Sequence, residues 1–385
     1  MTQAPLPSDK PSSSENGRKV RNRLSKSVAA QICVAIAALS LLAISFPGRM
    51  DSADAVQPEL RHYVAKIASF LASNRKPQIV ILGSSLMLYP ATLCDLQMEG
   101  KRPVDLDWYA AIFMPTYSDA KYFHKLLLDQ CNRSCEIVNL AVASSLMSDH
   151  CLLLEAVIAA DKNPELLVCG IAPRDFLDNN QPDFRLTPVH TLLADIRPEL
   201  FPSSNSHAPV SRLDRGVLQI KRAVSCLRIQ ANELFCQVTG RPPNDNASKM
   251  VAGELQFPPS KDKDLVVYKK VYTPVNEERF VEQKKYLERL LQDAKKLNIP
   301  VVLVSMPITP DNAHLLPPET LAKYNQTIKQ AAADYHVQLL DLQQSNSYGP
   351  GDYIDSCHLN AGGGAKFYKQ LVATICQSKL LSDTH

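Results

Sequence analysis

The chain has no strong excess of either charge. Its 42 Lys and Arg residues stand against 39 Asp and Glu residues, which leaves a formal net charge of +3. The most visible local excess is a basic cluster near the N-terminus. Because nucleic-acid binding by electrostatics needs a pronounced basic surface, this balance does not call for such a partner, and we expect none.

Metal-binding and cofactor-binding patterns are also scarce. The ten cysteines are scattered, and Cys131 with Cys135 is the only close pair. No second pair of ligands stands at finger-like spacing, and Gly362–Gly364 lacks the Lys-Ser/Thr of a phosphate-binding loop. We therefore expect no metal and no cofactor. The three glycines are expected to form a flexible entry to the last helix. Most cysteines are expected to be free and buried, and any disulfide pairing is left open.

What the chain does have is enough length and apolar content for a large core. With 385 residues, 45% hydrophobic and 21% charged, it suits one large α/β domain with an insertion, or two small domains. Five short apolar runs are bounded by turn-forming or polar residues and separated by enough chain for a crossover, which favours buried parallel strands. They are Gln78–Leu82, Glu136–Leu140, Leu166–Gly170, Val301–Ser305 and Val337–Leu340.

The intervening segments carry helical patterns. Apolar residues recur on one face of Phe280–Leu297 and of Pro318–Tyr335, and a closing helix is expected within Ala361–Leu381. Strands that alternate with helices predict an α/β fold, here a doubly wound, mainly parallel five-stranded sheet of flavodoxin-like kind. The stretch 178–272 breaks this alternation with Pro-rich turns, a helix near Leu213–Phe235 and a polar piece. It predicts an insertion over one end of the sheet that shapes substrate access.

The N-terminal region predicts a membrane anchor. Residues 1–27 read as a disordered cytoplasmic tail, and residues 28–46 contain no charged side chain. A helix of that length reaches ~28 Å, close to the thickness of the hydrocarbon core. The preceding Lys and Arg residues place the tail in the cytoplasm, so a single-pass membrane protein with a periplasmic or extracellular domain is expected. A stalk helix is expected at 51–76 and the main domain at 77–385.

Two other interpretations of the apolar segment remain. A cleaved signal peptide would fit the small residues Ala53 and Ala55, although signal cores usually span ~7 to 15 residues. A buried helix of a soluble domain is the third alternative, but the segment stands alone between a polar tail and a polar linker.

One serine stands where catalytic nucleophiles are often found. Gly83, Ser84 and Ser85 follow the first predicted strand, and ligands of open α/β sheets bind beyond the carboxyl ends of the strands. Near the C-terminus, Asp355 and His358 follow the last predicted strand. A serine nucleophile needs a base, and the base needs an acceptor that fixes its tautomer, so the three residues predict a catalytic triad. An ordinary turn is the alternative for each motif taken alone.

These motifs resemble those of the SGNH, or GDSL-type, hydrolase superfamily. The family's first block, Gly-Asp-Ser-Leu, is similar to Gly83-Ser84-Ser85-Leu86, and its last block, Asp-x-x-His, is similar to Asp355 to His358. The resemblance implies an SGNH-type, flavodoxin-like α/β fold with Ser85 as nucleophile, His358 as general base and Asp355 as the residue that orients the base. Ser84 stands where the family has Asp.

The two middle blocks match less closely. The second block resembles the sequence around Asn139, with Ser144 at the position of the oxyanion-hole glycine. Gly83, Asn139 and Ser144 are therefore expected around the oxyanion or the substrate. The third block, Gly-x-Asn-Asp, has no Asn here. Arg174 is the candidate replacement, as an oxyanion donor or as the partner of an anionic substrate group. The alternative is an Arg174–Asp175 pair that only braces the loop.

The order of anchor, Gly-Ser-Ser turn and C-terminal Asp-x-x-His is similar to membrane-anchored SGNH proteins of teichoic-acid D-alanylation and alginate acetylation. That resemblance implies a serine esterase or O-acyltransferase acting on acyl esters of a cell-envelope or exported polysaccharide, beside a membrane-bound O-acyltransferase as a possible partner. The alternative function is a catalytically weak or inactive scaffold that binds a polymer or a membrane acyltransferase.

Overall fold

A computed structural model of the chain describes residues 66–100, 117–181, 183–201, 261–343 and 345–381. All of these lie in the unit Val56–His385. The predicted tail and the predicted membrane anchor at 28–46 lie outside the described residues. Within the described residues, no helix is both long enough and apolar enough to cross a bilayer.

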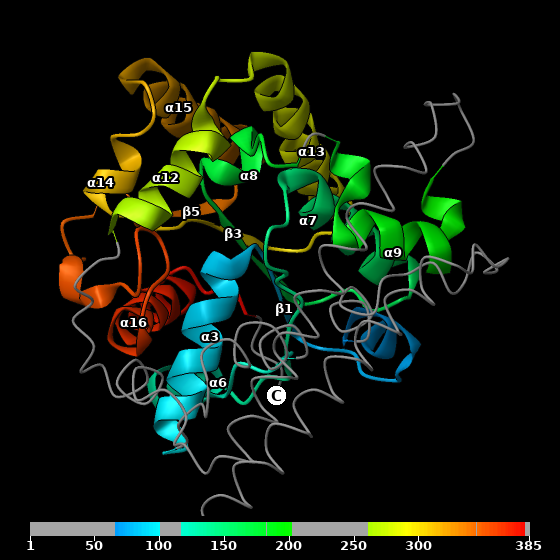
Figure 1. Cartoon of the computed structure of the whole chain (residues 1–385). Helices are drawn as coiled ribbons and strands as arrows, with labels where there is room; N and C mark the ends of the chain where they lie inside the picture. Colours follow the sequence, from blue (N-terminus) through cyan, green and yellow to red (C-terminus); the bar gives the residue numbers. More distant parts are fainter. Residues whose placement is uncertain (1–65, 101–116, 182, 202–260, 344, 382–385) are drawn as a thin grey trace, which may run out of the picture. The chain divides into compact units, whose positions relative to one another are not determined.

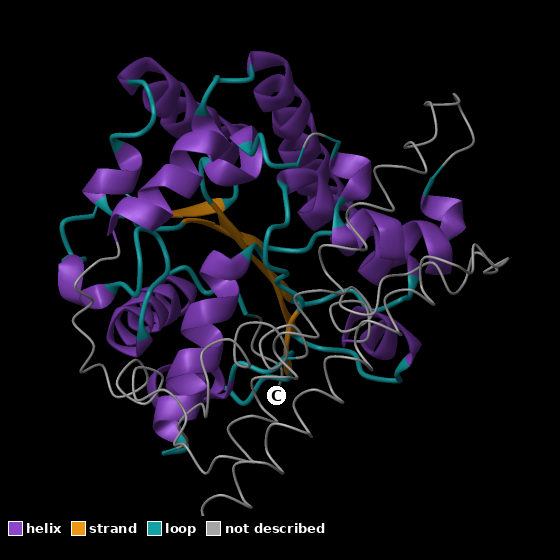
Figure 2. Ribbon diagram, viewed as in Figure 1, coloured by secondary structure: helices purple, strands orange, loops and turns teal. Residues whose placement is uncertain are grey.

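The centre of the fold is a parallel five-stranded sheet with the order β2-β1-β3-β4-β5. Figure 2 shows its strands in orange among the helices. The strands are β1 (Ile79–Leu82), β2 (Ile137–Asn139), β3 (Leu166–Ile171), β4 (Val301–Ser305) and β5 (Gln338–Asp341). The five predicted strands are confirmed to within two residues at each end. β1, β2, β3 and β4 are buried along their whole length, as expected for strands covered on both faces, whereas the edge strand β5 is half-buried.

Helices cover both faces of the sheet, which confirms the doubly wound α/β architecture (Figure 1). One layer contains α3 (Ser85–Met98), α6 (Lys121–Cys131) and α16 (Ala361–Gln377); the other contains α7 (Met147–Ala159), α13 (Glu277–Lys296) and α15 (Pro318–Tyr335). The three predicted helices correspond to α13, α15 and α16. Short elements complete the connections: α8 (Arg174–Leu177), α14 (Pro310–Ala313) and the 3₁₀ turn η5 (Pro350–Asp352).

Local sequence explains where the longest helix begins and what it covers. The Asn276 side chain accepts a hydrogen bond from the Arg279 N–H at 3.0 Å and caps α13, and Glu277 and Glu278 occupy the first turn. Phe280, with five other residues on one face of the helix, is buried against the rest of the domain. The polar opposite face then remains in water.

The glycines at the start of α16 serve close packing rather than a flexible entry. Gly363 and Gly364 are buried inside the first turn of the helix. A Cβ atom on Gly363 would lie 2.3 Å from the Asp352 carbonyl oxygen, and one on Gly364 would lie 2.8 Å from the Cys94 Sγ atom. Any larger residue would separate α16 from η5 and α3.

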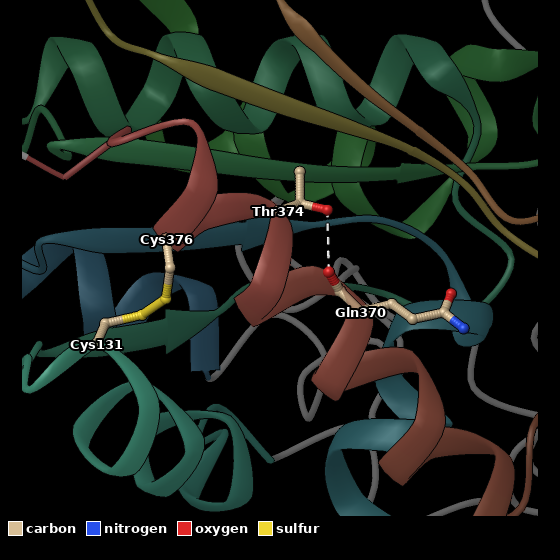
Figure 3. Close-up of a disulfide and its surroundings, with 4 residues drawn as sticks. All are labelled: Cys131, Gln370, Thr374 and Cys376. Carbon is tan, nitrogen blue, oxygen red and sulfur yellow. Dashed lines mark hydrogen bonds between the residues drawn. A yellow bond between two sulfur atoms is a disulfide. The ribbon is translucent and has the colours of Figure 1, made fainter.

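A disulfide joins the C-terminal ends of α6 and α16, at Cys131 and Cys376 (Figure 3). The Cα atoms are 5.9 Å apart, a normal separation for such a bond. The same helices also pack through Phe123 and Tyr368, whose ring centroids lie 5.3 Å apart. The sequence left this pairing open. Free buried cysteines, the expectation for most of the ten, are found within the described residues at Cys94, Cys135, Cys151, Cys169 and Cys357.

The described end of the predicted stalk, residues 66–72, is helical and packs onto the domain. Ile67 and Phe70 are 1% and 4% exposed. The buried Lys66 ammonium donates hydrogen bonds to the carbonyl oxygens of Ala141, at 2.7 Å, and Tyr117, at 3.0 Å.

The predicted insertion is described only at its two ends. The first end holds η3 (Phe184–Leu186), α9 (Pro188–Ile196) and η4 (Pro198–Leu200), and α9 packs beside α7. The second end is α12 (Lys261–Tyr272). The predicted helix at 213–235 lies outside the described residues.

Candidate active site

The turn after β1 places Ser85 at the first position of α3. Gly83 forms this turn with a φ of +153°. A Cβ atom there would lie 2.4 Å from the Met87 Cγ atom, so only glycine fits both the backbone and the space. Because the first N–H groups of a helix have no acceptor within the helix, donors and the positive end of the helix dipole lie beside Ser85.

The loop before α16 brings His358 and Asp355 to this serine. The His358 Nε2 atom lies 2.7 Å from the Ser85 Oγ atom, and its Nδ1 atom lies 2.6 Å from the Asp355 Oδ2 atom. The two motifs are 273 residues apart in the sequence. The three residues that the sequence singled out therefore form one continuous hydrogen-bonded chain, which is the geometry that a Ser-His-Asp triad requires.

The electrostatics of this chain favour an ionised Asp355. Burial alone would raise its pKa, but the His358 imidazole and the N–H groups of His358 and Cys357 together hold the pKa below the ordinary value. Those N–H groups lie 2.7 and 2.9 Å from the Asp355 Oδ1 atom. A carboxylate held this way fixes the histidine tautomer with the proton on Nδ1, which leaves Nε2 free to accept the serine proton.

Tyr89 is a further residue of this site, and no sequence motif marks it. Its ring stacks on the His358 imidazole with centroids 4.2 Å apart and an interplanar angle of 28°. Tyr89 stands four residues after Ser85 in α3, so both side chains lie on the same face of the helix. The four-residue spacing from Ser85 was the sequence feature that could have indicated Tyr89. An aromatic face against the imidazole restricts its rotation and favours a transient imidazolium.

The turn after β2 holds the second group of expected residues. Ser144 has a φ of +65°, which is in the left-handed region that glycine adopts most easily. The Asn139 Oδ1 atom accepts a hydrogen bond from the Ala141 N–H at 2.9 Å. Asn139 is fully buried, so it shapes this turn.

Ser145 joins that turn to the Ser85 turn, a link that the sequence did not reveal. The Ser145 hydroxyl lies 3.0 Å from the Gly83 carbonyl oxygen and 3.0 Å from the His150 Nε2 atom, and the Val142 N–H also donates to Gly83 at 3.0 Å. Burial lowers the pKa of His150 to about 3, so this imidazole is neutral; with its proton on Nε2 it can donate to the Ser145 oxygen while the Ser145 hydroxyl donates to the Gly83 carbonyl oxygen.

Arg174 is paired with carboxylates of its own turn. Its Nη2 atom donates to the Asp178 Oδ2 atom at 2.5 Å, and its Nη1 atom lies 4.0 Å from the Asp175 Oδ1 atom. Burial raises the pKa of Asp175 to about 7, against the opposing effects of Arg174 and of a hydrogen bond from Ser84. The turn after β1 and the turn after β3 are thus connected through Ser84 and Asp175.

One group of side chains in the described part of the chain has metal-ligand geometry, and it overlaps the same loop. Ligand atoms of Asp355, Cys357 and His358 lie within 4.8 Å of one another. Burial raises the pKa of the Cys357 thiol well above its ordinary value, which opposes the thiolate that metal ions bind. The arrangement therefore suits proton transfer at Ser85 better than metal binding.

No protein-family model matches the chain, and no curated protein matches it. Solved structures with some likeness include a catalytic mutant of the acetylxylan esterase Axe2 from Geobacillus stearothermophilus, with 12% identity, a TM-score of 0.39, and coverage of 81% of this chain and 99% of that one. TesA has 11% identity and a TM-score of 0.36, covering 79% and 99%.

A lipase/acylhydrolase from Enterococcus faecalis has 9% identity and a TM-score of 0.37, covering 80% of this chain and 99% of that one. At such identities and scores these likenesses establish neither family membership nor activity.

Proposed function

We propose that the chain is a serine esterase or O-acyltransferase that acts on acyl esters of a cell-envelope or exported polysaccharide. The observation that carries the proposal is the continuous chain from the Ser85 Oγ atom through His358 to Asp355, with contacts of 2.7 and 2.6 Å. The resemblance of the sequence motifs to the SGNH superfamily supports the same chemistry. The polysaccharide substrate rests on that resemblance.

In the proposed reaction Ser85 attacks the ester carbonyl while its proton passes to the His358 Nε2 atom. The N–H groups of Ser85 and Ser144 bind the oxyanion of the tetrahedral intermediate. As the intermediate collapses, His358 returns the proton to the leaving alcohol and the acyl group remains on Ser85. Water or a sugar hydroxyl then attacks the acyl-enzyme with His358 again as base, so hydrolysis and transfer share all earlier steps.

We further propose that residues 28–46 anchor the chain in the membrane with the domain outside the cytoplasm, beside a membrane-bound O-acyltransferase. The Cys131–Cys376 disulfide supports an oxidising compartment, because disulfides persist outside the cytosol. Protease protection in intact cells tests the orientation: the domain should be cleaved by added protease, and protection of the domain would refute it.

Hydrolysis of p-nitrophenyl acetate by the full chain in detergent tests the chemistry. We expect activity in the parent and its loss in Ser85→Ala and His358→Ala variants that remain folded by circular dichroism. Activity that survives both substitutions would refute the triad. An inactive parent would favour the scaffold function, since Arg174 is held by Asp178 and no third-block Asn is present.

A further inference from the structure

We propose that α12 acts as a positioning clamp on the loop that carries Asp355 and His358, an inference that rests on the function proposed above. α12 is followed in the chain by α13 and then by β4. It belongs to the segment that interrupts the α/β alternation. Nothing in the motif resemblance assigns a role to this helix.

The side chains that make the clamp lie on one stripe of α12. Asp264, Tyr268 and Tyr272 are spaced four residues apart, which places them one above another on a single helix face. Tyr268 and Tyr272 are 9% and 1% exposed, whereas Val266 and Val267 are 55% and 51% exposed. The buried stripe therefore faces the domain and the other side faces water.

Two members of the stripe directly contact the two residues between Asp355 and His358. The Asp264 Oδ2 atom accepts a hydrogen bond from the Ser356 N–H at 2.9 Å. The Tyr268 hydroxyl lies 2.7 Å from the Cys357 Sγ atom.

Tyr272 acts through an intermediate residue. Its hydroxyl donates to the Asn312 Oδ1 atom at 3.2 Å, and the Asn312 Nδ2 atom donates to the Ser356 Oγ atom at 2.9 Å. Thr309 is the N-cap residue of α14, and its N–H and hydroxyl donate to the Ser356 carbonyl oxygen at 3.0 and 2.8 Å. The backbone and side chain of Ser356 are thus held on several sides.

The clamp matters because the Asp355–His358 spacing must be fixed to a fraction of an ångström for proton transfer to Ser85. The Cys357 Sγ atom also lies 3.4 Å from the His358 Nδ1 atom, beside the Asp355 carboxylate. If the Tyr268 contact were lost, the thiol could move and compete for this nitrogen. Asp264, Tyr268 and Tyr272 are therefore positioning residues, and they act on the chemistry through Asp355 and His358.

The test separates positioning from simple stability. Active sites in the full chain are counted with a fluorophosphonate, and kcat for p-nitrophenyl acetate is expressed per counted site. We expect Asp264→Ala and Tyr268→Phe to lower this kcat by about tenfold with KM little changed. Asp264→Asn keeps an acceptor for the Ser356 N–H and should restore most of the rate. Lys270→Ala, on the exposed face of the same helix, is the matched control.

Equal kcat per counted site in the parent, Asp264→Ala and Tyr268→Phe would overturn the clamp, even if the variants melt earlier. A second readout does not need activity: alkylation of Cys357 by iodoacetamide should accelerate in both variants, while Cys169, equally buried on β3, stays unreactive. If the parent neither hydrolyses ester nor labels, the proposed function fails, and the alkylation rates still decide the clamp: unchanged Cys357 rates overturn it.

Discussion

Removing the Cys131–Cys376 disulfide should lower the free energy of unfolding without changing the site. The bond joins residues 245 apart in the sequence, so it restricts a large part of the unfolded chain. The loop-entropy argument gives about 5 kcal/mol for a loop of this length, and native disulfides typically contribute about 2–4 kcal/mol. At roughly 2–4 °C per kcal/mol for a domain of this size, we expect a melting temperature lower by about 5–15 °C.

The assay compares thermal unfolding of the parent and a Cys131→Ala/Cys376→Ala variant, each with and without a reductant. Reductant should lower the melting temperature of the parent toward that of the variant and should not affect the variant. The Phe123–Tyr368 contact between the same helices remains, so ester hydrolysis at 25 °C should be retained. Equal melting temperatures in all four samples, or free thiols at both positions in the untreated parent, would show that the disulfide does not stabilise the fold.

Three further predictions concern the site and its surroundings. Gly83→Ala should lower ester hydrolysis and reduce the free energy of unfolding by about 1–3 kcal/mol, because the φ of +153° and a Cβ position 2.4 Å from the Met87 Cγ atom exclude a side chain. Unchanged activity and stability would contradict this. Ser144→Gly should retain activity with equal or higher stability, whereas Ser144→Val should lose both, because a β-branched residue is strained at positive φ; equal behaviour of the two variants would contradict it. Burial raises the pKa of Asp149 to about 7. Between about pH 4 and 7 the folded state therefore binds more protons than the unfolded state. The contribution of this carboxyl to the free energy of unfolding then falls as pH rises, by up to about 1.4 kcal/mol per pH unit. Asp149→Asn removes that slope, so its melting temperature relative to the parent should rise from pH 5 to pH 7.5; a constant difference would show that Asp149 does not titrate in this way.

The sheet was predictable because its signals are local. Four of the five strands are buried along their whole length, which favours the short apolar runs that the sequence displays. The proximity of Ser85 to Asp355 and His358 was also predictable, because parallel strands bring their carboxyl ends to one edge of the sheet. Ser85 directly follows the turn after β1, and Asp355 and His358 lie in the connection between β5 and α16. The edge strand β5 extends one residue further than predicted, to Asp341, where burial no longer selects for apolar side chains.

What the sequence did not reveal are contacts between distant segments that no periodicity marks. The pairing of Cys131 with Cys376 depends on how α6 packs against α16. The approach of Tyr268 to Cys357 depends on where the insertion returns to the domain. For Arg174, both a brace and an oxyanion role were compatible with the sequence, and only the position of the Asp178 carboxylate 2.5 Å away shows its partner.

Covalent labelling with a fluorophosphonate tests the central claim most directly, because such reagents react with a serine only when a base and an oxyanion site activate it. The full chain is labelled and digested, and the modified residue is found by mass spectrometry, with Ser85→Ala and His358→Ala variants alongside. We expect one label on Ser85 in the parent and none in either variant. Label on another serine, or undiminished labelling of Ser85 in His358→Ala, would contradict this expectation.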